Sequence, residues 1–113
     1  MNQYHEPYDK LDEETRDITR AIKSLTEELE AVDWYNQRMA VTKDAELREI
    51  LKHNRDEEVE HAAMMLEWLR RKMPILDDEL KENLFKKGPI GHHDHEEAPS
   101  PKTKSLNIGS LKE

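Results

Sequence analysis

The sequence contains no cysteine. This absence excludes disulfide bonds, thiolate metal sites and cysteine nucleophiles, so any bound metal must be held by oxygen and imidazole nitrogen atoms. The sequence also lacks an apolar run long enough to cross a bilayer, and it has no signal-peptide pattern of a basic start and an apolar stretch. We therefore expect no membrane partner.

Basic residues are fewer than acidic ones. The sequence has 18 lysines and arginines and 26 aspartates and glutamates, which gives a net charge of −8. An acidic surface argues against binding to nucleic acid or to an anionic membrane, and it suits the binding of cations. With 113 residues, of which 39% are charged and 35% hydrophobic, the chain has room for at most one small domain with tails.

Glycine and proline are absent from two long segments with helical periodicity. Residues 8–40 are predicted to form one helix and residues 45–72 a second, because their apolar residues recur at spacings of three and four. Residues 41–44 form a short turn, in which Thr42 or Asp44 is a suitable N-cap for the second helix. So short a turn between two helices predicts an antiparallel hairpin.

A short third helix is predicted over residues 75–87, which are stopped by Gly88 and Pro89. Pro74 either ends the second helix or begins the third. Residues 1–7 are expected to form a loose N-terminus. Residues 1–90 are therefore predicted to be one all-α domain.

Residues 91–104 are polar apart from Ala98, and such a segment cannot bury enough surface to offset its ordering entropy. We predict a disordered linker there. Its three closely spaced histidines form either a weak chelator or a polar spacer, and their role stays open: His92, His93 and His95. Apolar residues return in a distinct C-terminal segment, residues 105–113.

A two-helix hairpin buries little surface by itself. The large side chains of the two long helices are also spread around more than one face: Trp34, Tyr35, Met64, Met65 and Trp68. We therefore predict an obligate homo-oligomer, of which a two-fold dimer is the simplest form. Two hairpins side by side make a four-helix bundle.

Glu58 and His61 form an E-x-x-H motif on the second predicted helix. A separation of three places both side chains on one face, with about 5–6 Å between their Cβ atoms, so they can bind the same metal ion. Glu28 lies on the apolar stripe of the first helix, and Tyr35 follows two turns along that stripe. Charged groups on such a stripe are costly unless they are paired or bind a metal. The three ligands are half of a di-metal site, and a two-fold axis would supply the other half.

The residues alone leave simpler interpretations open. In so acidic a chain an E-x-x-H motif also arises by chance on a solvated helix face. Glu27 and Glu30 are then plain surface charges, and Trp34 and Tyr35 are packing residues.

Two distant parts of the sequence resemble one family, the encapsulated ferritins. The first part is the helical sequence from Glu27 to Tyr35, together with the two stretches from His53 to Met64 and from Leu66 to Arg71. The second part is the C-terminal segment Leu106-Asn107-Ile108-Gly109-Ser110-Leu111-Lys112, which is similar to the peptide that docks such cargo inside an encapsulin shell. The resemblance covers most of the chain.

This resemblance implies a half-ferritin, in which two chains form a four-helix bundle with a di-iron ferroxidase centre between them, and the dimers close into an annular decamer. It implies that Glu28, Glu58 and His61 are iron ligands and that Tyr35 lies near the centre. It also implies that Glu27 and Glu30 attract incoming metal beside Trp34.

The resemblance further implies a location inside an encapsulin nanocompartment in the prokaryotic cytoplasm. Its shell protein would be reached through Leu106, Ile108, Gly109 and Leu111. Gly109 would let the backbone turn or approach the shell wall closely.

Carboxylate and imidazole ligands suit Fe(II), and open coordination positions admit an oxidant. We therefore expect an oxidoreductase, a ferroxidase that passes Fe(III) to the shell for storage. Calcium, zinc or manganese can occupy the same ligands. Two alternatives are a peroxide-consuming di-iron protein and a non-enzymatic helical adaptor that binds metal for stability.

Overall fold

A computed structural model describes residues 4–91, and every regular element in that range is helical. The elements are a 3-10 helix, η1 (Tyr8–Lys10), and the α-helices α1 (Glu13–Val41), α2 (Ala45–Lys72) and α3 (Pro74–Asn83). The all-α prediction is confirmed. None of these helices combines the length and apolar character needed to cross a membrane. The chain divides into two compact units between Lys72 and Met73, and each is described by itself.

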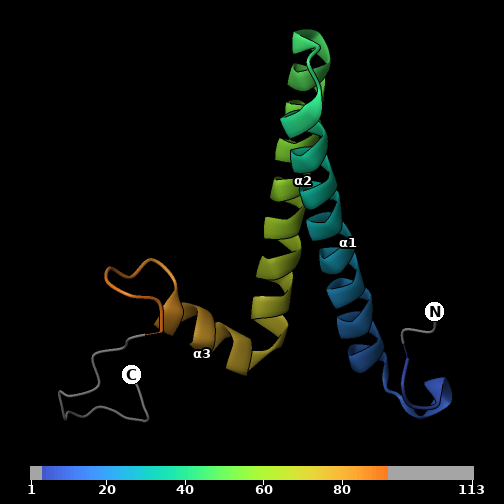
Figure 1. Ribbon diagram of the computed structural model, residues 1–113. Coiled ribbons are helices and arrows are strands. Elements are labelled where there is room, and N and C mark those ends of the chain that lie inside the picture. The colour runs from blue at the N-terminus through green and yellow to red at the C-terminus, as the bar shows by residue number, and fades with distance from the viewer. Residues whose placement is uncertain (1–3, 92–113) are drawn as a thin grey trace. The chain divides into compact units, whose positions relative to one another are not determined.

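The long first unit is an antiparallel hairpin in which α1 and α2 lie side by side (Figure 1). Its buried residues are Ala21 on α1 and Ala62 and Leu69 on α2. Larger apolar side chains remain exposed on both helices: Ile22, Leu29, Trp34, Val41, Leu47, Ile50, Val59 and Met64. The hairpin therefore presents much of its apolar surface outward, as the sequence pattern predicted.

The first helix begins later than predicted. Asp12 is its N-cap, because the Asp12 carboxylate accepts a hydrogen bond of 2.7 Å from the backbone N–H of Thr15. Before that cap Leu11 is extended, and between residues 4 and 11 only η1 is helical. The prediction of one helix over residues 8–40 was thus wrong at its N-terminal end, where a side-chain cap takes the place of a further α-helical turn.

The turn between α1 and α2 is closed by side chains. Asp44 caps α2, because its Oδ1 accepts a hydrogen bond of 2.9 Å from the N–H of Leu47. Arg48 reaches back from α2 and donates to the carbonyl oxygens of Met39 and Thr42. These carbonyls belong to the end of α1, where backbone acceptors lack helical partners.

The second unit contains α3, which starts with Pro74 in its first turn. Proline suits this position because its missing N–H has no helical acceptor there, so Pro74 begins the third helix. The helix ends at Asn83 and not at residue 87 as predicted. Leu84 is extended and Phe85 has a positive φ of 59°, so the backbone leaves the helix before the first glycine.

The part of the predicted linker after Gly91 lies outside the described residues, as do its histidines. The same holds for the predicted targeting segment at residues 105–113.

Candidate metal centre

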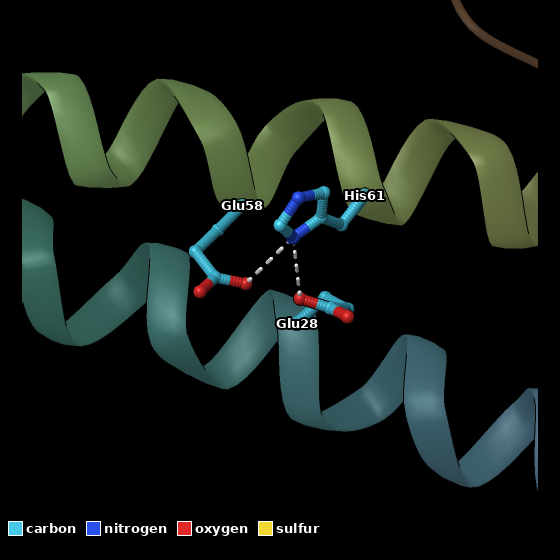
Figure 2. A group of neighbouring side chains, drawn as sticks. All are labelled: Glu28, Glu58 and His61. Carbon is cyan, nitrogen blue, oxygen red and sulfur yellow. Dashed lines mark ion pairs between the residues drawn. The ribbon is translucent and has the colours of Figure 1, made fainter.

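Three of the predicted site residues meet near the middle of the hairpin. Glu58 and His61 project from α2 toward α1, and Glu28 projects from α1 toward them (Figure 2). Each offers one ligand atom, and these atoms all lie within 4.8 Å of one another. Among residues 4–91 this is the one such group of three or more histidine, aspartate or glutamate side chains. We call it the Glu28–Glu58–His61 cluster.

The imidazole lies between the two carboxylates. His61 Nδ1 is 3.5 Å from Glu28 Oε1 and 3.7 Å from Glu58 Oε1, and both contacts are ion pairs when the ring is protonated. The two carboxylate side chains are about a quarter exposed, whereas 45% of the His61 side chain is exposed. The cluster is therefore enclosed on the hairpin side and accessible from outside.

The carboxylates of Glu28 and Glu58 are close enough to hydrogen-bond through a shared proton. This hydrogen bond raises the pKa of Glu28 above its usual value, and partial burial and the charge of Glu58 act in the same direction. His61 opposes the shift by favouring the ionised carboxylate. Two carboxylates held together in this way favour the arrival of a positive charge, either a proton or a metal cation.

The other predicted site residues are not part of this cluster. Tyr35 is half-buried on α1, and the guanidinium carbon of Arg38 is 5.4 Å from the centre of its ring. Glu27 and Glu30 are exposed on α1, and Trp34 is 51% exposed. The positions of Glu27 and Glu30 leave them free to meet cations in solvent.

Sequence reasoning missed two residues that join the helices beside the cluster. Arg55 on α2 donates a hydrogen bond of 3.0 Å from Nη1 to Asn36 Oδ1 on α1. No pattern on a single helix reveals this contact. Arg48 and Arg55 are seven residues apart on α2, which places both on one face of that helix but does not show what they meet on α1.

A carboxylate pair and an imidazole are the ligand types that iron, manganese and zinc accept in proteins. The Glu28–Glu58–His61 cluster can therefore hold a metal ion, with coordination positions left for ligands from outside the hairpin. The fold and this cluster define the chain as a helical-hairpin protein of the ferritin-like class with a group of potential metal ligands between its two long helices.

Comparison with known proteins places the chain more narrowly. A family model described as EncFtn-like matches residues 3–87. A "Ferritin-like protein" of Thermotoga maritima is 50% identical over 111 residues, which cover 98% of this chain and 97% of the relative. The chain belongs to the EncFtn-like family, and its predicted membership of the encapsulated ferritins is confirmed.

Two further relatives support this assignment. An "Encapsulated ferritin-like protein" of Rhodospirillum rubrum is 57% identical over 89 residues, which cover 79% of this chain and 64% of the relative. The crystal structure of protein ne0167 from Nitrosomonas europaea has a TM-score of 0.77 and 62% identity, and the match covers 80% of this chain and all of that chain.

Proposed function

We propose that this protein is a ferroxidase, which oxidises Fe(II) to Fe(III) at a di-iron site shared by two copies of the chain. The observation that carries the proposal is the convergence of Glu28 from α1 with Glu58 and His61 from α2 in a member of the EncFtn-like family. Iron is the substrate of this reaction as well as the ion that the cluster holds.

One chain supplies too few ligands for two metal ions. Di-iron carboxylate bundles use a glutamate from each of two helices and a Glu-x-x-His motif from each of two others. One hairpin offers half of this set, and a two-fold axis doubles it. A second hairpin is the favoured source of the other half of the ligands. His61 is exposed on its outer side, and Trp34 and Met64 leave apolar surface that a second hairpin could cover.

The roles of the side chains follow from their chemistry. The carboxylates of Glu28 and Glu58 neutralise the charge of bound iron and favour the more highly charged Fe(III). His61 supplies a nitrogen ligand and must be unprotonated to do so. Each Fe(II) loses one electron to oxygen, and the Fe(III) product then hydrolyses. Tyr35 lies near the reacting ions, and Glu27 and Glu30 collect Fe(II) from solvent.

The proposal extends to the assembly in which the enzyme works. Dimers form an annular decamer, which the C-terminal segment tethers inside an encapsulin shell in a prokaryotic cytoplasm. A ring has no closed cavity, so the shell stores the mineral. The support for this part is the name of the Rhodospirillum rubrum relative and the apolar residues of the C-terminal segment: Leu106, Ile108 and Leu111.

Stopped-flow absorbance of Fe(II) oxidation in air tests the proposal. His61→Ala is expected to reduce the initial rate by roughly tenfold or more, because loss of even an outer contact to a ligand costs a metal site that much. The same loss is expected for Glu58→Ala.

His53→Ala is the matched control, since His53 lies on the same helix and pairs with Glu57 at 3.3 Å on an exposed face. This variant should oxidise iron at the parent rate. Equal rates for the parent, His61→Ala and Glu58→Ala would refute the ferroxidase proposal.

A further inference from the structure

Arg55 connects the two long helices between the turn and the metal-binding cluster. Its Nη1 donates to Asn36 Oδ1 at 3.0 Å, while Nε and Nη2 donate to Asp56 Oδ1 at 3.1 and 3.0 Å. The Arg55 side chain is 27% exposed. Asp56 thus holds one edge of the guanidinium on α2, and the other edge reaches across to α1.

This contact lies on the turn side of the cluster on both helices. Arg55 is three residues before Glu58, or about 4.5 Å along α2, and Asn36 is eight residues after Glu28, or about 12 Å along α1. Arg48 also joins α2 to the end of α1, but it does so at the turn, farther from the cluster than Arg55. A bond between Arg55 and Asn36 therefore limits how far α1 can slide or lean relative to α2 at the cluster.

The cluster needs such a restraint. Glu28 lies on α1 whereas Glu58 and His61 lie on α2, so the distances between the ligand atoms depend on how the two helices are placed against each other. The buried residues of the hairpin are Ala21, Ala62 and Leu69. Two of these three are alanines, which bury little area and so offer little resistance to a lateral displacement of the helices.

We infer that Arg55 is a positioning residue, which acts through its hydrogen bond to Asn36 to hold Glu28 opposite Glu58 and His61 before metal binds. The ordered cluster then binds a divalent cation without first having to bring the helices together, and affinity rises for that reason. The role in iron oxidation rests on the proposed function, but the effect on metal affinity does not.

Simple electrostatics predicts a different pattern. If Arg55 acted only through its positive charge, its removal would strengthen cation binding at the cluster, and a neutral change at Asn36 would have no effect. The positioning role predicts weaker binding when Asn36 loses its acceptor, although the charge of the protein stays the same. Asn36→Ala therefore separates the two effects.

Titration calorimetry with Co(II), which is stable in air, measures this affinity on the full-length assembled protein. Asn36→Ala is expected to weaken Co(II) binding by roughly three- to tenfold, the effect of losing one hydrogen bond of ordinary strength. Asn36→Asp keeps an acceptor for Arg55 and adds a negative charge, so it should retain at least the parent affinity. Gln37→Ala is the matched control, because Gln37 bonds only within α1, to Asp33 at 3.2 Å.

Kinetics provide a second readout that general loss of structure would not reproduce. In stopped-flow oxidation, Asn36→Ala should raise the Fe(II) concentration for half-maximal rate while the maximal rate changes by less than about twofold. Parent-like Co(II) affinity in Asn36→Ala, or an equal loss of affinity in Asn36→Asp, would overturn the inference. If the parent binds Co(II) but oxidises no iron, the proposed function fails while the positioning role is still tested by affinity.

Discussion

At Glu28, the stability of the metal-free protein and the proposed binding of metal make opposite demands on the side chain. Its carboxylate lies beside that of Glu58, which raises the pKa of Glu28 and makes Glu28 easier to protonate. The stability that comes from this proton is present in full below the unfolded pKa of 4.5 and is lost as the pH rises through the higher folded pKa. When both carboxylates are ionised, the metal-free hairpin carries a like-charge repulsion that a bound cation would remove.

We predict that Glu28→Gln raises the melting temperature of the metal-free protein at pH 7 by roughly 2–5 °C. The amide removes one of the two charges and can still hydrogen-bond to Glu58. The difference in melting temperature should vanish well below pH 4.5, where the parent carboxylate is protonated in both the folded and the unfolded state. Thermal unfolding followed by circular dichroism with a chelator present measures this.

Adding Co(II) should give the parent the higher melting temperature of the two. The parent has the Glu28 carboxylate to bind the metal, and metal binding stabilises the folded state, whereas Glu28→Gln has lost this carboxylate. Glu27→Gln removes an exposed neighbouring carboxylate outside the cluster and serves as the control, with little change in either condition. A lower melting temperature for metal-free Glu28→Gln at pH 7 would contradict the repulsion between Glu28 and Glu58.

At the scale of the helices, capping side chains determine where each element begins. Asp12 and Asp44 bond to backbone N–H groups three residues ahead, and they set the first residues of α1 and α2. The cap at Asp12 also leaves the preceding residues free to form η1. There Arg16 donates two hydrogen bonds to the carbonyl oxygen of Tyr8, at 3.2 and 2.6 Å.

We expect Asp12→Ala to lower the melting temperature by roughly 3–6 °C, because the N–H of Thr15 loses its acceptor at the start of α1. Asp12→Asn should behave like the parent near neutral pH, since asparagine is an equally good N-cap. Thermal unfolding of the two variants side by side is the measurement. If they lose stability equally, the charge and not the cap is what matters at this position.

The elements were largely predictable from sequence, and their ends were less so. Helical spacing of apolar residues and the lack of glycine and proline identified the two long helices and the turn between them. The end of α3 escaped prediction, because Leu84 and Phe85 leave the helix without a glycine or proline to mark the change. The start of α1 depended on one side-chain bond that periodicity does not reveal.

The candidate site shows the same limit. The spacing of Glu58 and His61 is local and was visible in the sequence, and the apolar stripe pointed to Glu28. The contact between Arg55 and Asn36 joins residues 19 apart, so it depends on the register of the hairpin. Register is a property of two packed helices, and a single-helix pattern does not contain it.

At the scale of the whole molecule, the hairpin has an apolar surface that it does not cover itself. Exposed apolar side chains lie on both helices, among them Trp34 on α1 and Ile50 and Met64 on α2. A second copy that covers such a surface would bring its own glutamates and histidine toward the first. We therefore expect assembly and metal binding to stabilise each other.

Removal of residues 105–113, which lie outside the described residues, should leave iron oxidation intact and abolish co-purification with an encapsulin shell. The segment is separated from the α2 ligands by more than forty residues of chain, and its apolar side chains are suited to pockets on a partner. Co-expression with a shell protein, followed by size separation, is the measurement. Undiminished encapsulation of the truncated chain would contradict the targeting role.

The central claim is that two copies of the chain build one site for two iron ions. Native mass spectrometry of the protein with anaerobic Fe(II) tests this most directly, because it counts chains and metal ions in the same particle. We predict that iron appears in pairs, two ions for every two chains, on dimers and larger species and not on the single chain. A single chain that binds iron as tightly as the dimer would contradict the account.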